Sequence, residues 1–168
     1  MGKAMKTEKG RRAIGAVKNT VIVVCLATVI ISATFFAVRS ILKAEFPMKY
    51  QDKISLYAET YGVPEDLLYG VIHTESGYDE KAKSHAGAIG LTQITPETFL
   101  WLQTKTGETL PEEALYDADT SVKYCAVFYG LLLKEFGGDE KTAIAAYHAG
   151  RGQVNAWLRD PDISPDGK

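Results

Sequence analysis

The chain has 168 residues, of which 46% are hydrophobic and 24% charged, and its formal net charge is −2. This composition is ordinary for one globular domain with a short extension. The first 18 residues hold six basic residues and one acidic residue, a charge of +5, so the rest of the chain carries −7. That acidic balance argues against a nucleic-acid binder, whose phosphate contacts need a basic face.

The first predicted element is a transmembrane helix over residues 19–38, a stretch without a charged residue, Gly or Pro. Twenty helical residues at about 1.5 Å each span about 30 Å, the hydrocarbon thickness of a bilayer. The stretch lacks the Ala-x-Ala exit typical of a cleaved signal peptide. Val24 before Cys25 does not suit a lipoprotein cleavage site either. We therefore expect an uncleaved anchor.

The charges around this helix predict its orientation. The basic tail, residues 1–18, is expected to stay in the cytoplasm, and the basic residues after the span, such as Arg39, weaken this bias without reversing it. Residues 39–49 are expected to be a linker. These features predict a single-pass membrane protein with its domain outside the cytoplasm.

Residues 50–160 predict a mainly α domain, large enough for one core, without sustained strand alternation or an internal repeat. Capping residues and glycines delimit its helices. The expected helices are one carrying Ile54, Tyr57 and Tyr61 before Gly62, one from Pro64 to Gly77, one from Thr95 to Gly107, one from about Thr120 to Gly137, one from Asp139 to Gly150, and a last one carrying Val154, Trp157 and Leu158.

Glu75 is the first candidate functional residue. It follows Leu68, Val71 and Ile72 at helical spacing, so its carboxylate falls on an apolar stripe in the last turn of a helix. Loss of water and the partial negative charge of the helix end both oppose ionisation, which should raise its pKa above about 4.3. Such a carboxylic acid can protonate a glycosidic oxygen. The helix alone supports an exposed Glu at a frayed end equally well.

Cysteine and histidine residues give no sign of a nucleophile, a metal or a cofactor. Cys125 falls on an apolar stripe, where a buried structural thiol is favoured over a reactive one. His73, His85 and His148 are not at a metal-ligand spacing, and the chain has no His-Glu-x-x-His. We therefore expect no metal site and no cofactor.

Three separated segments carry a family resemblance. They are Glu75-Ser76, then Ser84 followed by Gly-Ala-Ile-Gly-Leu-Thr-Gln-Ile-Thr-Pro-Glu-Thr over residues 87–98, and Ala-Ala-Tyr-His-Ala-Gly-Arg-Gly-Gln-Val over residues 145–154. In this order they resemble the lytic transglycosylase SLT domain, a family with a lysozyme-like fold. The resemblance covers roughly residues 50–158.

The resemblance implies the roles of the site residues. Glu75 corresponds to the single catalytic carboxylate of the family, and Ser84 to a serine that helps hold that Glu and the substrate's N-acetyl group. Gln93 corresponds to a groove-lining Gln and Tyr147 to a Tyr near the catalytic acid. The expected substrate-binding residues are Ser76, Ser84, Gly90, Gln93, Tyr147, Ala149 and Gly150.

Several of these residues also have a purely structural interpretation. Gln93 could make a hydrogen bond within its loop, and Tyr147 could be a core aromatic. Two tryptophans, Trp101 and Trp157, could stack on sugars or be partly buried packing residues. The remaining carboxylates that could partner Glu75 are interpreted as turn or helix-capping residues: Asp79, Asp117 and Asp119.

Three departures from the family pattern are visible. Thr92 stands where Met is usual, and we expect it to adjust the shape of the groove and little else. His148 replaces the usual Asn, which changes the hydrogen bonds near Tyr147. Residues 161–168 correspond to a loop that the family continues into a further helix, so the chain is expected to be either a truncated product or a domain whose groove lacks one wall.

The implied function is cleavage of the β-1,4 bond between N-acetylmuramic acid and N-acetylglucosamine in peptidoglycan, with formation of 1,6-anhydromuramic acid. Glu75 would act as acid and then as base, which removes the need for the second carboxylate of most glycosidases. Two alternatives stay open: a hydrolase like goose-type lysozyme, and an inactive glycan-binding or scaffold module. The expected partners are glycan strands and, through the anchor, the bacterial cell membrane, and the sequence does not identify protein partners.

Overall fold

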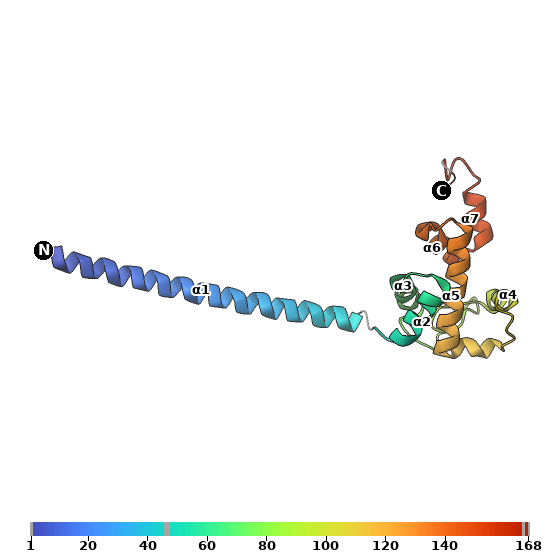
Figure 1. Ribbon diagram of the computed structural model, residues 1–168, viewed down its shortest axis with the longest axis horizontal. Coiled ribbons are helices and arrows are strands. Elements are labelled where there is room, and N and C mark those ends of the chain that lie inside the picture. Colours follow the sequence, from blue (N-terminus) through green and yellow to red (C-terminus); the bar gives the residue numbers. More distant parts are fainter. Residues whose placement is uncertain (1, 46–47, 166, 168) are drawn as a thin grey trace. The chain divides into compact units, whose positions relative to one another are not determined.

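The computed structural model describes residues 2–45, 48–165 and 167, and it contains two compact units, Met1–Pro47 and Met48–Lys168. Within the described residues there are helices and two isolated β-bridges but no strand, which confirms a mainly α protein (Figure 1). The elements are α1 Gly2–Glu45, α2 Gln51–Tyr61, α3 Glu65–Ser76, α4 Pro96–Thr106, the 3₁₀ helix η1 Glu112–Tyr116, α5 Ala118–Glu135, α6 Glu140–Ala149 and α7 Arg151–Trp157.

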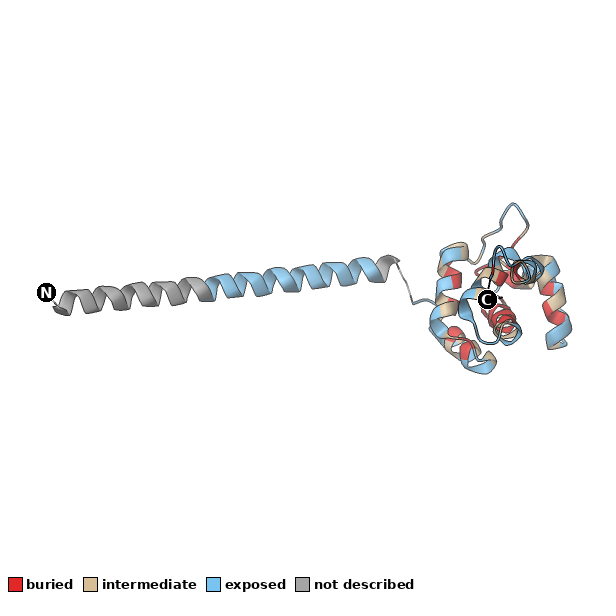
Figure 2. Cartoon of the chain, turned by 90° about the horizontal axis from the view of Figure 1, so that it is seen from above, coloured by how far each residue is buried: buried red, intermediate tan, exposed pale blue. Residues whose placement is uncertain are grey.

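The first unit contains α1. Its apolar stretch Val21–Leu42 is 22 residues long with a mean hydropathy of 2.8, and none of it is buried. Figure 2 shows this exposure along the second half of the helix. The stretch is suited to crossing a bilayer by length and composition. The helix runs on through Glu45, so most of the residues expected as a linker are helical.

The second unit is built around α5, which Figure 1 shows between α2 and α3 on one side and α4 on the other. The buried side chains of α5 include Tyr124 and Tyr129, both fully shielded from solvent. Leu68 and Ile72 of α3 and Phe99 of α4 are shielded to the same extent, within 1%. These helices are therefore fixed by one shared core, visible as the buried faces in Figure 2.

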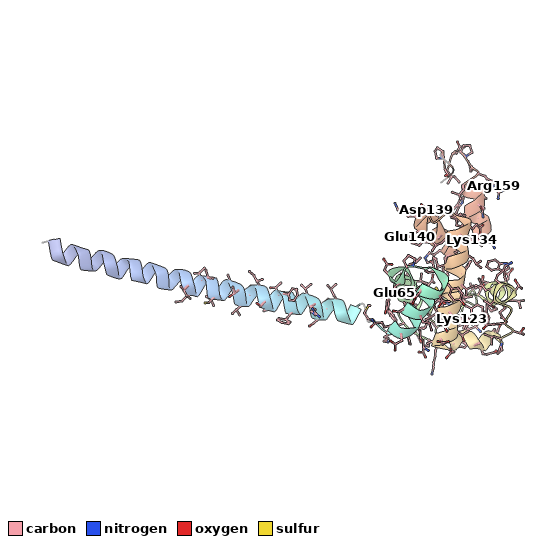
Figure 3. All side chains as sticks on the ribbon, in the orientation of Figure 1. Glu65, Lys123, Lys134, Asp139, Glu140 and Arg159 are labelled. Carbon is pink, nitrogen blue, oxygen red and sulfur yellow. The ribbon has the colours of Figure 1, made fainter. Side chains whose placement is uncertain are left out.

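The predicted helix ends are largely confirmed. The side chains of Thr95, Asp117 and Asp139 accept hydrogen bonds from backbone N–H groups in the first turns of α4, α5 and α6. Gly62, Gly77 and Gly107 end α2, α3 and α4 in the left-handed conformation that favours glycine. Asp139 and Glu140, labelled in Figure 3, mark the start of α6.

One carboxylate has a different role from the one predicted. Asp119 was expected to cap a helix, and this is wrong. It accepts hydrogen bonds from Tyr57 Oη at 2.7 Å and from Lys53 Nζ at 3.0 Å, so it joins α5 to α2. Asp117 does cap α5, and Asp79 accepts from Lys81 N in a turn, as expected.

Candidate functional site

Glu75 lies in the last turn of α3, and 20% of its side chain is exposed. The three apolar residues of its stripe, Leu68, Val71 and Ile72, are buried in the core. The carboxyl group is thus held at the boundary between core and solvent. Burial raises the pKa of Glu75 above its ordinary value, which confirms the direction that the sequence predicts.

His148 of α6 contacts Glu75 directly. Its Nδ1 lies 3.0 Å from Glu75 Oε1. A positive charge on His148 favours the carboxylate and lowers the pKa of Glu75, but the larger effect of burial outweighs it. The sequence indicated a change of hydrogen bonding near Tyr147, and it did not reveal this contact with the catalytic candidate.

Side chains of α5 and α6 pack against each other in the core near the candidate site. The ring of Tyr147 stacks on Tyr129, with centroids 4.6 Å apart and planes 7° from parallel. The Tyr147 hydroxyl donates to the carbonyl oxygen of Thr92 at 2.7 Å. Cys125 is fully buried, and burial raises the pKa of its thiol to about 12, which confirms a structural thiol. Tyr147 is partly buried and packs against the core beside Cys125 and Tyr129, whose pKa values the charge of Glu75 also raises.

The loop between α3 and α4 carries two further candidates. Ser84 is exposed, and its Oγ accepts a hydrogen bond from Ala88 N at 3.0 Å. The side-chain amide of Gln93 donates to the carbonyl oxygens of Gly90 at 2.9 Å and Ala82 at 3.3 Å. Gln93 therefore makes hydrogen bonds within its own loop, as its structural interpretation predicts. A contact of Gln93 with a substrate stays a prediction.

Ser76 and Gly90 hold this loop in place. The Ser76 hydroxyl donates to Leu91 O at 2.8 Å, which joins the end of α3 to the loop. Gly90 is buried with φ 75°, and a Cβ built on it would lie 2.0 Å from Leu115 O. Both residues were predicted to bind substrate, and both are engaged with backbone groups of the domain itself.

The structure gives Thr92 a packing role, and its effect on the shape of the groove stays a prediction. Its side chain is fully buried and lies 3.0 Å from Ser121 Oγ on α5, so it has no part in the surface of a groove. Its carbonyl oxygen accepts the Tyr147 hydrogen bond. A polar side chain fits here because α5 supplies a partner, which the sequence motif could not show.

The remaining candidates lie at the surface or at its edge. Ala149 and Gly150 are exposed at the end of α6, where a ligand could approach the backbone. Trp101 packs edge-on against Phe128, with centroids 5.8 Å apart, and the guanidinium of Arg151 lies 4.7 Å from its ring centre. A packing role therefore accounts for Trp101.

A pocket of about 350 Å³ lies between α3 and α6; His148 lines it, and Glu75 does not. Thr74, Tyr129 and His148 contribute to its wall. The arrangement offers a half-buried acid and a basic partner in contact with it, and this partner also lines the pocket. It can give a proton to a bound ligand and take one back.

Comparison with known families identifies the domain. Residues 52–166 match the model of the Transglycosylase SLT domain. The chain is 30% identical over 120 residues to the soluble lytic murein transglycosylase of Escherichia coli K12, a match that covers 70% of this chain and 18% of that protein. It is 31% identical over 128 residues to the membrane-bound lytic murein transglycosylase C of Haemophilus influenzae PittEE, covering 69% of this chain and 36% of that protein.

Solved structures agree with this assignment. An inactive mutant of the lytic transglycosylase Slt from Pseudomonas aeruginosa superimposes with a TM-score of 0.68 at 29% identity, over 71% of this chain and 20% of that one. A complex of a 70-kDa soluble lytic transglycosylase with bulgecin A gives 0.67 at 28% identity, over 70% and 19%. The chain thus spans about a fifth to a third of the length of these relatives, and it belongs to the Transglycosylase SLT domain family.

Proposed function

We propose that the chain is a peptidoglycan lytic transglycosylase that uses Glu75 as its catalytic acid and base. The observation that carries the proposal is the half-buried Glu75 at the end of α3, whose pKa burial raises within a domain of the SLT family. Relatives of this chain are named lytic murein transglycosylases, which supports a glycan strand of peptidoglycan as substrate.

The proposed reaction needs one carboxyl group in two steps. Protonated Glu75 gives its proton to the oxygen of the β-1,4 bond between N-acetylmuramic acid and N-acetylglucosamine. As the bond from that oxygen to the muramoyl C1 breaks, the substrate's own N-acetyl group stabilises the cationic carbon. The Glu75 carboxylate then takes the proton of the C6 hydroxyl, and O6 bonds to C1 to close the 1,6-anhydro ring. Glu75 ends the cycle protonated.

The raised pKa of Glu75 suits both steps. A carboxyl group with an ordinary pKa is almost fully ionised near neutral pH and so has no proton to donate. Burial raises the pKa of Glu75, which keeps more of it protonated. The carboxylate formed after the first step sits in a partly dry site, where it is a stronger base than in water. The same desolvation therefore favours donation and then removal of a proton.

Substitution of Glu75 by Gln tests this assignment. Glu75→Gln keeps the size of the side chain and removes its acid and base function, so peptidoglycan turnover should fall to background. The matched control is Glu65→Gln, which removes an exposed carboxylate from the first turn of the same helix. Turnover that survives in the Glu75 variant at the wild-type rate would remove Glu75 from the mechanism.

We further propose that α1 anchors the domain in the bacterial cell membrane by a single span, with the domain outside the cytoplasm. The apolar stretch Val21–Leu42, the basic tail before it and the membrane-bound relatives support this. The full-length protein should stay with the membrane after a carbonate wash. Protease added outside spheroplasts should digest the domain, and protection of the domain would reverse the proposed orientation.

A further inference from the structure

The contact between His148 and Glu75 joins the end of α6 to the end of α3. His148 Nδ1 and Glu75 Oε1 are 3.0 Å apart, within hydrogen-bond distance. The His148 side chain is 45% exposed and the Glu75 side chain 20%. One member of the pair is therefore open to solvent protons, and the other is shielded.

Among the described residues, His148 is the basic group whose charge lowers the pKa of Glu75. On α5, burial and the charge of Glu75 both raise the pKa of Cys125 and of Tyr129, so both stay neutral at ordinary pH. Tyr147 of α6, with its ring 6.0 Å from that of His148, is neutral for the same reason. Two carboxylates, Asp66 of α3 and Glu140 of α6, line the pocket that His148 also lines.

We propose that His148 is a positioning residue for Glu75: its ring holds the carboxyl group in place, and a positive charge on that ring stabilises the carboxylate that exists between the two proton transfers. This inference rests on the proposed function and deepens it, because it assigns a role to a residue that differs from the Asn usual at this position in the family.

The number of protons on the Glu75–His148 pair limits the role of His148. Glu75 loses its proton to the glycosidic oxygen and recovers one from the C6 hydroxyl, so the pair has the same number of protons before and after turnover. His148 neither gains nor loses a proton in this sequence. The contact at Nδ1 positions Glu75 throughout the cycle, and a positive charge on His148 lowers the energy of the intermediate in the interval when Glu75 is ionised.

Burial and His148 act on Glu75 in opposite directions. Burial disfavours the carboxylate, and the imidazolium favours it. Without burial the acid would be too readily ionised to donate a proton, and without His148 the carboxylate intermediate would lack its partner. The balance between them should set the pH above which the enzyme loses activity.

Replacement of His148 by Asn isolates the charge. Asn keeps an amide that can donate a hydrogen bond, but it cannot carry a positive charge. His148→Gln provides a second variant with a longer amide, in case Asn disturbs the fold. His85→Asn is the matched control, because His85 is an exposed histidine in the loop after Ser84.

The decisive measurement is a carbon-13 NMR titration of the Glu75 carboxyl in the full-length protein in detergent micelles, assigned with Glu75→Gln. We expect the Glu75 titration to move to higher pH in His148→Asn and His148→Gln and to stay in place in His85→Asn. The alkaline limb of the kcat/KM profile for peptidoglycan should move in the same direction, which loss of a merely structural contact would not cause.

The outcomes separate this inference from the proposed function. Titration curves that coincide in wild type and both His148 variants would overturn the inference, whatever the activity. The Glu75 titration could shift in the His148 variants although the wild-type protein does not cleave peptidoglycan. That result would overturn the proposed function and the catalytic role of the pair, and it would support the electrostatic coupling of His148 to Glu75.

Discussion

Replacement of Gly90 by Ala should destabilise the second unit far more than replacement of Gly87 by Ala. Both glycines lie in the loop between α3 and α4 with positive φ, 75° and 83° respectively. A Cβ on Gly87 would meet nothing within 4 Å, whereas a Cβ on Gly90 would lie 2.0 Å from Leu115 O. The pair of variants therefore separates the cost of the backbone conformation from the cost of the close contact.

The magnitudes follow from these two terms. A left-handed conformation costs an alanine about 1–2 kcal/mol, and the reduced freedom of the unfolded chain returns about 0.4–1 kcal/mol. Gly87→Ala should thus cost about 1 kcal/mol. Gly90→Ala adds an overpacking cost of about 1–3 kcal/mol, because a backbone carbonyl cannot move aside cheaply. Its total should be about 2–4 kcal/mol.

Thermal unfolding followed by tryptophan fluorescence measures this difference. Both tryptophans of the chain, Trp101 and Trp157, lie in the second unit, so the signal is insensitive to α1. For a unit of this size 1 kcal/mol shifts Tm by about 4 °C. We expect a decrease of about 4 °C for Gly87→Ala and of about 8–16 °C for Gly90→Ala. Equal decreases would refute the close contact of Gly90 with η1.

Three further predictions concern single side chains. Thr92→Val should cost about 1–2 kcal/mol in chemical unfolding because Ser121 Oγ loses the partner at 3.0 Å, and an unchanged midpoint would contradict the buried hydrogen bond. Hydrogen bonds from Lys123 and Tyr124 lower the pKa of Glu108. The stability that ionised Glu108 gives the fold is therefore present above the unfolded pKa of about 4.3 and is lost as the pH falls through the folded pKa. Glu108→Gln should lower Tm at neutral pH and leave it unchanged in acid. Burial raises the pKa of Glu75, so ionisation of Glu75 lowers the stability of the fold as the pH rises through the folded pKa. Glu75→Gln should therefore raise Tm at neutral pH but not below about pH 4. A lower Tm at neutral pH would show that the His148 contact outweighs burial.

Local signals explain why most of the fold could be predicted. A cap is a relation between a residue and the next three, as in Thr95 with Thr98 or Asp139 with Thr142, so the sequence alone contains it. The burial of the stripe that leads to Glu75 follows from helical spacing in the same way. The short helix η1 was missed because five residues are too few to show a period.

Contacts between distant segments explain what could not be predicted. Asp119 occupies a plausible capping position, and only the packing of α5 on α2 shows that it binds Tyr57 and Lys53. Thr92 stands within a motif associated with the groove, and only the packing of the loop on α5 shows that it is buried. The contact of His148 with Glu75 joins α6 to α3, so no spacing rule could have found it.

The structure also changes the weight of the predicted site residues. Ser76, Gly90 and Gln93 are held by hydrogen bonds or close packing inside the domain, so they are expected to shape the loop as much as to touch a sugar. Ala149 and Gly150 stay exposed at the end of α6. Substrate contacts of all five residues remain predictions.

Mass spectrometry of the fragments released from purified peptidoglycan by the full-length protein in detergent tests the central claim most directly. Glu75→Gln serves as the control. The account predicts fragments that end in 1,6-anhydromuramic acid and that are absent with the variant, because the C6 hydroxyl captures the cationic carbon with Glu75 as base. Fragments with reducing ends would show that water captures it, as in a hydrolase, and would contradict the account.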